Sequence, residues 1–406
     1  MPEAVIVSTA RSPIGRAGKG SLRDLRPDDL AAQMVRAALA KVPALDPRDV
    51  DDLMLGTAQP AGEGGYNLGR AVGILAGMDH LPGVTVNRYC SSSLQTTRMA
   101  LHAIRSGEGH VFISAGVETV SRFGHGMADE NPGTHNPFFA EAEARTAARS
   151  AEGAERWTDP RDTGALPDLY ITMGQTAENV AQLAGVTRRE QDEFGVRSHQ
   201  RAEAAIADGF FEREITPVTL PDGQVVRTDD GPRPGTTIEG VEQLKPVFRP
   251  DGTVTAANCC PLNDGAAALV VMSDTKAAEL GLTPLARIVA TGVSGLSPEI
   301  MGLGPVEASR RALALAGMSI GDIDLVEINE AFAAQVIPSA RELGIDEDRL
   351  NVHGGAIALG HPFGMTGARI TSTLINGLQS RDQQFGLETM CVGGGQGMAM
   401  ILERLS

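Results

Sequence analysis

The chain has 406 residues, which is enough for about two or three domains of ordinary size. Hydrophobic residues make up 42% of it and charged residues 21%, and this balance excludes a chain that is disordered as a whole. The net charge is −16, which argues against nonspecific binding to nucleic acid or to an anionic membrane, since both need a basic surface.

The four cysteines are Cys90, Cys259, Cys260 and Cys391. They show neither a zinc-binding spacing nor the density of a disulfide scaffold, so we expect no metal site and a reducing compartment. The chain enters an apolar run at residues 5–7 without a signal or transit segment, and no stretch is apolar enough to cross a bilayer. We therefore predict a cytoplasmic protein without a membrane span.

Short β-branched runs alternate with helical spacing along the first 120 residues. Strands are predicted over 4–8, 50–55, 84–87 and 111–115, and helices over 28–41 and 91–106. The same alternation returns in the last third, with strands over 286–290, 323–328, 387–391 and 398–402 and helices over 306–316 and from Thr366. This pattern predicts an α/β fold with a mainly parallel sheet.

The two alternating regions can be superposed as an internal repeat. A shift of 271 residues places Cys90 on His361 and Arg98 on Arg369. Two copies related by a pseudo-twofold axis would bring the loops of Cys90 and His361 together. Between the copies, residues 122–262 differ in character, with helices predicted over 175–184 and 188–208, a capping box from Thr187 to Glu190, and a hairpin around 221–223. We expect this insertion to cover a ligand or to serve assembly.

Cys90 lies between a predicted strand and a predicted helix. A thiol at a helix N-terminus meets the positive end of the helix dipole, which lowers the pKa of the thiol and favours a nucleophilic thiolate. A lone cysteine is more commonly a small buried hydrophobe, so its position alone leaves both interpretations open.

Three further residues lie at positions where a catalytic role is physically reasonable. His361 lies in a glycine-rich turn before Pro362, where a neutral imidazole can accept a proton or polarise a carbonyl group. Cys391 precedes a run of glycines whose N–H groups can stabilise an oxyanion. Asn329 follows a strand, at the end where α/β sheets place ligands. Each of the three also has a structural interpretation: a turn histidine, a core cysteine and a capping asparagine.

The four segments together resemble the thiolase family. The segment VNRYCSSSLQ at 86–95 is similar to the acyl-enzyme cysteine block of thiolases. The segments NEAFA at 329–333, GGAIALGHP at 354–362 and CVGGG at 391–395 match the other three catalytic blocks, in the family's order. The likeness extends to ARSPIG at 10–15 and NDGAA at 263–267, and so spans essentially the whole chain.

The resemblance implies a five-layered αβαβα fold built from two similar α/β halves with mixed sheets. It implies an N-terminal half of residues 1–121 with 263–283, an inserted loop domain of 122–262 that binds coenzyme A, and a C-terminal half of 284–406. It also implies a homodimer or homotetramer, and it is compatible with a partner in a fatty-acid β-oxidation complex.

The resemblance further implies an acetyl-CoA C-acyltransferase or C-acetyltransferase. Cys90 would become acylated, His361 would activate it, and Asn329 would hold a water in one oxyanion hole. Cys391 would exchange the α-proton, and the N–H groups of Cys90 and Gly393 would form a second oxyanion hole. Coenzyme A is a substrate here, and no cofactor is implied.

The resemblance implies that coenzyme A contacts Arg233, Met173, Cys260, Ala256 and Phe248. Two departures affect this surface: Thr172 stands where relatives commonly carry a histidine, and Cys260 stands in place of a serine. The alternatives are a ketoacyl-synthase-like condensing enzyme, which would lack a second catalytic cysteine such as Cys391, and a non-catalytic lipid carrier or scaffold, which would be expected to lose catalytic residues.

Overall fold

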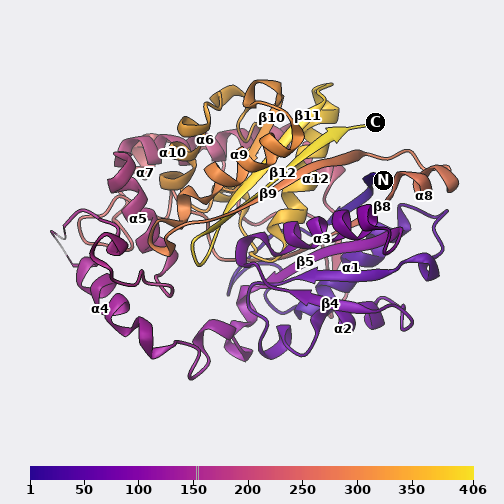
Figure 1. The fold of residues 1–406 in the computed structure, drawn as a ribbon, viewed down its shortest axis with the longest axis horizontal. Helices are drawn as coiled ribbons and strands as arrows, with labels where there is room; N and C mark the ends of the chain where they lie inside the picture. Colours follow the sequence, from indigo (N-terminus) through magenta and orange to yellow (C-terminus); the bar gives the residue numbers. More distant parts are fainter. Residues whose placement is uncertain (152, 154) are drawn as a thin grey trace.

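A computed structural model describes residues 1–151, 153 and 155–406 (Figure 1). The N-terminal half contains β1 Ala4–Arg11, β2 Gly15–Arg16, α1 Pro27–Ala40, β3 Asp52–Gly56, α2 Leu68–Leu75, β4 Gly83–Val86, α3 Ser92–Ser106 and β5 Val111–Thr119, and is completed by β8 Asn263–Ser273 and α8 Asp274–Glu279. The C-terminal half contains β9 Ala286–Gly295, α9 Gly304–Ala316, β10 Leu325–Ile328, α10 Ala333–Leu343, α11 Ala356–Leu359, α12 Thr366–Ser380, β11 Phe385–Val392 and β12 Gln396–Arg404. The expected strands and helices of both halves are confirmed, with shifts of a few residues at their ends.

The main sheet has the strand order β10-β11-β12-β9-β1-β8-β5-β3-β4, with β2 paired to β8. Only β10–β11, β3–β4 and β3–β5 pair in parallel, and the other neighbours are antiparallel. The expectation of a mainly parallel sheet is therefore wrong, and the mixed sheet is the correct description. Strands buried on both faces give continuous apolar runs in either direction, so the sequence pattern does not report strand direction.

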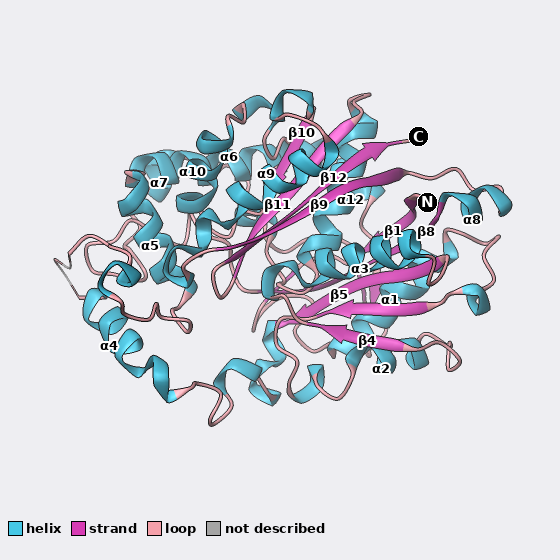
Figure 2. Ribbon diagram, viewed as in Figure 1, coloured by secondary structure: helices cyan, strands magenta, loops and turns pink. Residues whose placement is uncertain are grey.

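The two halves of the sheet meet at a narrow joint, where β1 pairs with β9 at only Val5–Arg287 and Ile6–Ala286. In Figure 2 the strands form two groups with α3 between them. Helices α3 and α12 share one hydrophobic core with strands of both halves, while α1 packs on the outer side of the N-terminal half and α9 and α10 on that of the C-terminal half. This arrangement gives the five layers of an αβαβα fold.

The two central helices cross near their N-termini. Ala368 N–H donates to Ser93 Oγ at 3.0 Å, and a Cβ on Gly367 would lie 2.3 Å from Leu94 N. A shift of 274 residues carries both ends of α3 onto those of α12, and the first residue of β5 onto the first residue of β11. Under this shift the pair 93–368 becomes the pair 367–94, so the two contacts are equivalent by symmetry. The shift of 271 is therefore wrong: Cys90 corresponds to Gly364 and not to His361. The repeat itself is real.

The inserted segment supplies α4 Ala140–Arg149, α5 Met173–Ala184, α6 Arg188–Ala207, β6 Val218–Thr219, β7 Val225–Val226 and α7 Ile238–Val241. The capping box at the start of α6 is confirmed, as is the hairpin, since β6 and β7 pair in antiparallel fashion. Figure 1 shows the magenta segment around α4 reaching away from both halves. Among the described residues, no helix has both the length and the apolar character needed to cross a membrane. The division into three sequence domains stays a prediction.

Candidate active site

Cys90 lies in the tight turn that joins β4 to α3. Residues Tyr89–Ser91 form one turn of 3₁₀ helix, and Tyr89 has a φ of +42°, which a side chain other than glycine adopts only under strain. The turn is held by Tyr89 N–H, which donates to Asn87 Oδ1 at 2.8 Å, and by Ser92 Oγ, which donates to the Tyr89 carbonyl oxygen at 2.7 Å. This strained turn presents Cys90 at the N-terminal end of α3.

The glycine turn between β11 and β12 meets Cys90 from the C-terminal half. Its positive φ values at Gly394 and Gly395 require residues without a Cβ, and this conformation brings the Gly393 N–H near enough to the Cys90 sulfur to lower the pKa of the thiol. Cys391 lies at the end of β11, fully buried in a cluster with Phe332. The structure thus brings the two predicted cysteines and Gly393 to one place.

The expected lowering of the pKa of Cys90 is wrong for the protein without substrate. Burial raises the pKa of the Cys90 thiol to about 11, and the nearby Gly393 N–H opposes this only in part. Burial also raises the pKa of Cys391 well above its usual value, and the nearby Cys90 adds to the effect. Both sulfurs are therefore thiols at neutral pH. The sequence pattern shows the helix N-terminus, but it does not show the desolvation that outweighs it.

His361 is buried and neutral, because burial, together with the charge of Arg369, lowers the pKa of the imidazole to about 3. Asn329 Nδ2 lies 3.3 Å from His361 Nε2, and His361 Nδ1 lies 2.6 Å from Thr366 Oγ1. With the Asn329 amide in this orientation, Nδ2 donates to Nε2, and Nδ1–H donates to Thr366, whose hydroxyl donates to the Pro362 carbonyl oxygen at 2.8 Å. This leaves Nε2 as the basic nitrogen.

Asn329 is held by the strand that precedes it. It follows β10, its N–H donates to the Thr389 carbonyl oxygen at 3.0 Å, and its own carbonyl oxygen accepts from Gln335 Nε2 at 2.6 Å. Its side-chain Oδ1 is buried and has no hydrogen-bond partner among the described residues. A buried acceptor of this kind needs a donor such as a water molecule.

Two buried glutamates hold the loops around this centre. Glu330 accepts hydrogen bonds from Ser198 Oγ at 2.6 Å, Asn351 Nδ2 at 2.8 Å and Ile357 N–H at 3.1 Å, and so fixes the loop that leads to His361. Glu118 accepts from Ala58 N–H at 2.8 Å and Gly364 N–H at 2.9 Å, which ties the end of β3 to the segment after His361. Burial raises the pKa of Glu118 to about 7.

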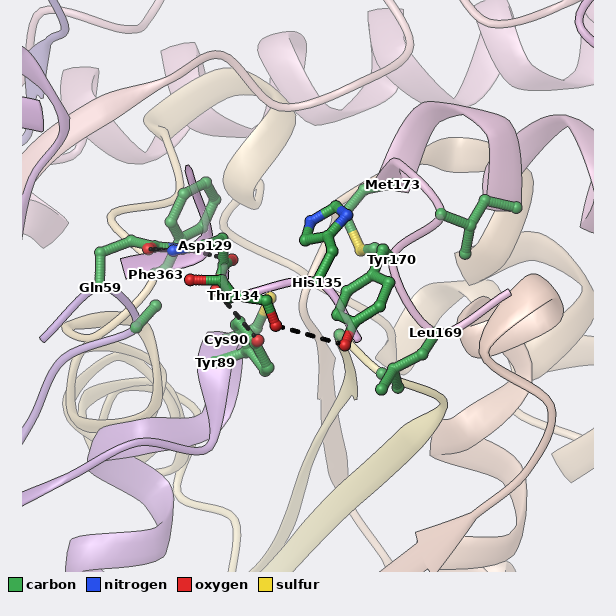
Figure 3. A pocket seen from close by; sticks show the side chains of 14 residues that line it. Gln59, Tyr89, Cys90, Asp129, Thr134, His135, Leu169, Tyr170, Met173 and Phe363 are labelled. Atoms are coloured by element: carbon green, nitrogen blue, oxygen red, sulfur yellow. Dashed lines mark hydrogen bonds between the residues drawn. The ribbon is translucent and has the colours of Figure 1, made fainter. Parts of the chain in front are cut away.

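Cys90 opens onto a cavity of about 240 Å³ (Figure 3). Of the predicted coenzyme A contacts, Met173 lines this cavity beside Cys90 and Gly393. Phe248 packs in the cluster that holds Met173 and Cys391. His361, Asn329 and Cys391 are buried and do not line the cavity. The His361 ring lies 5.1 Å, between centroids, from the ring of Phe363, which does line it.

The other predicted contacts lie around the segment that follows Asn329. Cys260 N–H donates to the Ala331 carbonyl oxygen at 3.0 Å, and the Cys260 thiol is near enough to Cys90 and Cys391 for their charges to raise its pKa, after the larger effect of burial. Arg233 and Ala256 make no direct contact with the cavity within the part of the chain that the structure describes. Burial lowers the pKa of Arg233, and the nearby Arg16 lowers it further.

Several residues at this site were not singled out from the sequence. Gln59, Asp129, His135 and Tyr170 line the cavity, and Thr366 orients the imidazole of His361. Gln59 follows β3 at its C-terminal end, a position that favours ligand contact and could have identified it. Asp129 and His135 lie in a segment without regular spacing, and no local signal indicates their role.

Comparisons with known proteins agree with this geometry. The family model "Thiolase, N-terminal domain" matches residues 4–275, and "Thiolase, C-terminal domain" matches residues 282–404. A 3-ketoacyl-CoA thiolase of Bacillus subtilis is 44% identical over 419 aligned residues, covering 99% of this chain and 100% of the relative. One from Serratia proteamaculans is 43% identical, with both chains covered at 100%.

Among solved structures, the acetyl-CoA acetyltransferase of Bacillus anthracis has a TM-score of 0.86 and 38% identity, covering 100% of this chain and 99% of that one. The match therefore includes both α/β halves and the inserted segment. With a shared fold, full-length matches to both family models and relatives above 40% identity, the chain belongs to the thiolase family.

Proposed function

We propose that this thiolase cleaves 3-ketoacyl-CoA into acetyl-CoA and a shortened acyl-CoA through an acyl-Cys90 intermediate, and that it also runs the reverse condensation of two acetyl-CoA molecules. The activity is that of an acetyl-CoA C-acyltransferase or C-acetyltransferase, as the names of its relatives suggest. The observation that carries the proposal is that Cys90 and Gly393 line the same cavity, with the Gly393 N–H near enough to the Cys90 sulfur to lower the pKa of the thiol.

In the first half-reaction the Cys90 thiol transfers its proton to His361 Nε2, and the sulfur forms a bond with C3 of the substrate. The C3 carbonyl becomes an alkoxide, which the N–H groups of Cys90 and Gly393 beside the Cys90 sulfur would stabilise. When the carbonyl re-forms, the C2–C3 bond breaks and its electron pair remains on C2 of the acetyl-CoA enolate. The Cys391 thiol then donates its proton to C2.

In the second half-reaction a new coenzyme A thiol gives its proton to the Cys391 thiolate. Its sulfur attacks the acyl carbon, and the Cys90 sulfur leaves and recovers the proton held by His361. The N–H groups of Cys90 and Gly393 would also stabilise the alkoxide formed in this step, since the acyl carbon is bonded to the Cys90 sulfur. The enolate oxygen of the first half-reaction would accept from a water on Asn329 Oδ1 and from the protonated His361 Nε2, which then no longer accepts from Asn329 Nδ2. The covalent intermediate divides one difficult bond cleavage into two easier steps.

Coenzyme A would approach over the inserted segment. Arg233 supports this, because no carboxylate or carbonyl oxygen among the described residues accepts from its guanidinium, and Arg16 places a second cation nearby. Two such cations in a chain of net charge −16 suit the phosphates of the ligand. Met173 and Phe248 offer an apolar lining for the pantetheine arm, and Cys260 and Ala256 are proposed as further contacts.

The remaining expectations stay predictions. They are the homodimer or homotetramer, the partner in a β-oxidation complex, the cytoplasmic location, and a reaction without a metal or redox cofactor. The synthase-like and carrier-like alternatives are less well supported, because Cys391 is near enough to Cys90 to be affected by its charge and His361 packs on Phe363, which lines the cavity.

The test is to mix the protein with acetoacetyl-CoA in the absence of free coenzyme A and to record its intact mass and a peptide map. We expect one acetyl group on the peptide that contains Cys90, and none in the Cys90→Ala variant. If the folded protein gains no acetyl group and releases no acetyl-CoA, the proposal is wrong.

A further inference from the structure

The cavity beside Cys90 is closed by a segment that the catalytic motifs do not explain. Asp129, Thr134 and His135 line it from the excursion that follows β5, together with Cys90 (Figure 3). We call residues 128–135 the cap. The cap is folded on itself, since Thr134 Oγ1 donates to the Ala128 carbonyl oxygen at 3.0 Å.

Asp129 anchors the cap to the nucleophile side of the cavity. Its carboxylate accepts hydrogen bonds from Gln59 Nε2 at 2.6 Å and from the Tyr89 hydroxyl at 3.2 Å, while its own N–H donates to Gln59 Oε1 at 3.1 Å. Figure 3 shows Asp129 between Gln59 and Tyr89. Three hydrogen bonds therefore join the cap to the end of β3 and to the turn of Cys90.

Tyr89 connects Asp129 to the turn that carries Cys90. It precedes Cys90 directly, and its ring lies against Gly393, so that a Cβ there would be 3.3 Å from Tyr89 Cγ. Burial, together with the charge of Asp129, raises the pKa of Tyr89 to about 12, so that the hydroxyl stays protonated and donates. Asp129 thus fixes Tyr89, whose ring packs against Gly393 next to Cys90.

The far end of the cap is held by aromatic contacts. The His135 ring stacks on the Tyr170 ring, with centroids 3.9 Å apart and planes within 7°, and Asn136 N–H donates to the Tyr170 hydroxyl at 2.9 Å. The cap is therefore docked at both ends. The space it leaves, about 240 Å³, falls below the roughly 300–1,000 Å³ of pockets that enclose a drug-sized ligand.

We propose that Asp129 is a positioning and specificity-determining residue: it holds the cap closed over acyl-Cys90 and restricts the acyl group to short and medium chains. The inference rests on the proposed function, since it concerns the acyl group that Cys90 would carry. A long chain would enter only if the hydrogen bonds of Asp129 to Gln59 and Tyr89 were broken. The free energy needed to break them would have to come from the binding of the long chain itself.

The experiment compares thiolysis of acetoacetyl-CoA and 3-ketohexadecanoyl-CoA in the full-length protein and in Asp129→Ala. We expect the ratio of kcat/KM for the long substrate to that for the short one to rise about tenfold, because about two side-chain hydrogen bonds that hold the cap are lost. The matched control is Glu130→Ala, which removes the next carboxylate of the cap. Glu130 is exposed and has no hydrogen-bond partner for its carboxylate among the described residues, so the ratio should stay at its original value.

Tyr89→Phe gives a second measurement if Asp129→Ala does not fold. It removes only the hydroxyl and keeps the ring on Gly393, so we expect the same direction of change at about threefold, and Asp129→Asn should restore most of the original ratio. An unchanged ratio in folded Asp129→Ala or Tyr89→Phe would overturn the inference. An equal loss on both substrates would also overturn it, because Asp129 would then serve only the Cys90 turn.

Acetylation of Cys90 by acetoacetyl-CoA is recorded by mass in every variant. If the original protein is not acetylated, the proposed function fails. If it is acetylated while the chain-length ratio does not respond to Asp129, only the present inference fails.

Discussion

Cys90 and Cys391 carry the same chemical group, but their surroundings give them different tasks. Cys90 lines the cavity together with Gly393, whereas Cys391 is fully buried at the end of β11. Burial keeps both as thiols at neutral pH, so each needs a partner that takes its proton during the reaction. Because Cys90 lines the cavity and Cys391 does not, we expect acylation at Cys90.

The separate tasks can be tested with Cys391→Ala. We expect kcat/KM for thiolysis of acetoacetyl-CoA to fall by about 10²–10⁴, since general acid catalysis at the α-carbon is lost. Exchange of labelled coenzyme A into acetyl-CoA makes and breaks no carbon–carbon bond, and its proton can pass between the coenzyme A thiol and His361. Its rate should therefore change by no more than about threefold. Cys259→Ala is the control and should leave both rates unchanged. Loss of exchange together with thiolysis would contradict this division of roles.

At the level of elements, the strands and helices around the site carry buried ionisable side chains. Glu388 on β11 accepts from Thr371 Oγ1 of α12 at 2.7 Å, but its other carboxylate oxygen has no partner among the described residues. Burial raises the pKa of Glu388 to about 8, Thr371 and Arg369 oppose this, and Glu327 adds to it. The Glu388 carboxyl group therefore stays protonated in the folded protein up to about pH 8.

This protonation predicts how stability depends on pH. Between about pH 4.5 and pH 8 the folded protein keeps a proton on Glu388 that the unfolded chain has lost, so stability falls as the pH rises through that range, by up to about 1.4 kcal/mol per pH unit for one group. Glu388→Gln keeps the acceptor for Thr371 and removes the titration. We expect its thermal midpoint, relative to the original protein, to rise between about pH 5.5 and pH 8.

The comparison variant for this measurement is Glu108→Gln, whose side chain is exposed at the end of α3. It should follow the pH profile of the original protein. If Glu388→Gln also follows that profile, Glu388 is ionised in the folded state. The conclusion that its carboxyl group is protonated would then be wrong.

At the scale of the whole molecule, the site exists only where the two halves touch. Gly116 on β5 and Gly364 after His361 approach so closely that a Cβ on Gly116 would lie 2.0 Å from the Gly364 carbonyl oxygen. Gly364 N–H also donates to Glu118, so this contact and the Glu118 carboxylate join the halves side by side. The position of His361 relative to Cys90 depends on this junction.

Gly116→Ala tests the junction. Because the clash is with backbone, we expect the free energy of unfolding to fall by about 1–3 kcal/mol or more, and acetylation of Cys90 to slow. Gly73→Ala in α2 is the control, since its nearest atom lies 3.8 Å from the new Cβ and alanine favours a helix by about 1 kcal/mol. A folded Gly116→Ala protein with unchanged stability and acetylation would show that the halves can move apart without cost to the site.

The sequence by itself determined the elements of both halves, the capping box of α6 and the residues that surround Cys90. Periodicity reports which face of an element is buried, and short motifs report local turns, so both can be interpreted without the fold. The tertiary structure decided the strand directions, the register of the repeat and the pKa of Cys90. It also decided the cap over the cavity, because Gln59, Tyr89 and Asp129 lie far apart in the chain and meet only when it folds. Desolvation and contacts between distant segments depend on the whole packed molecule, and no local pattern contains them.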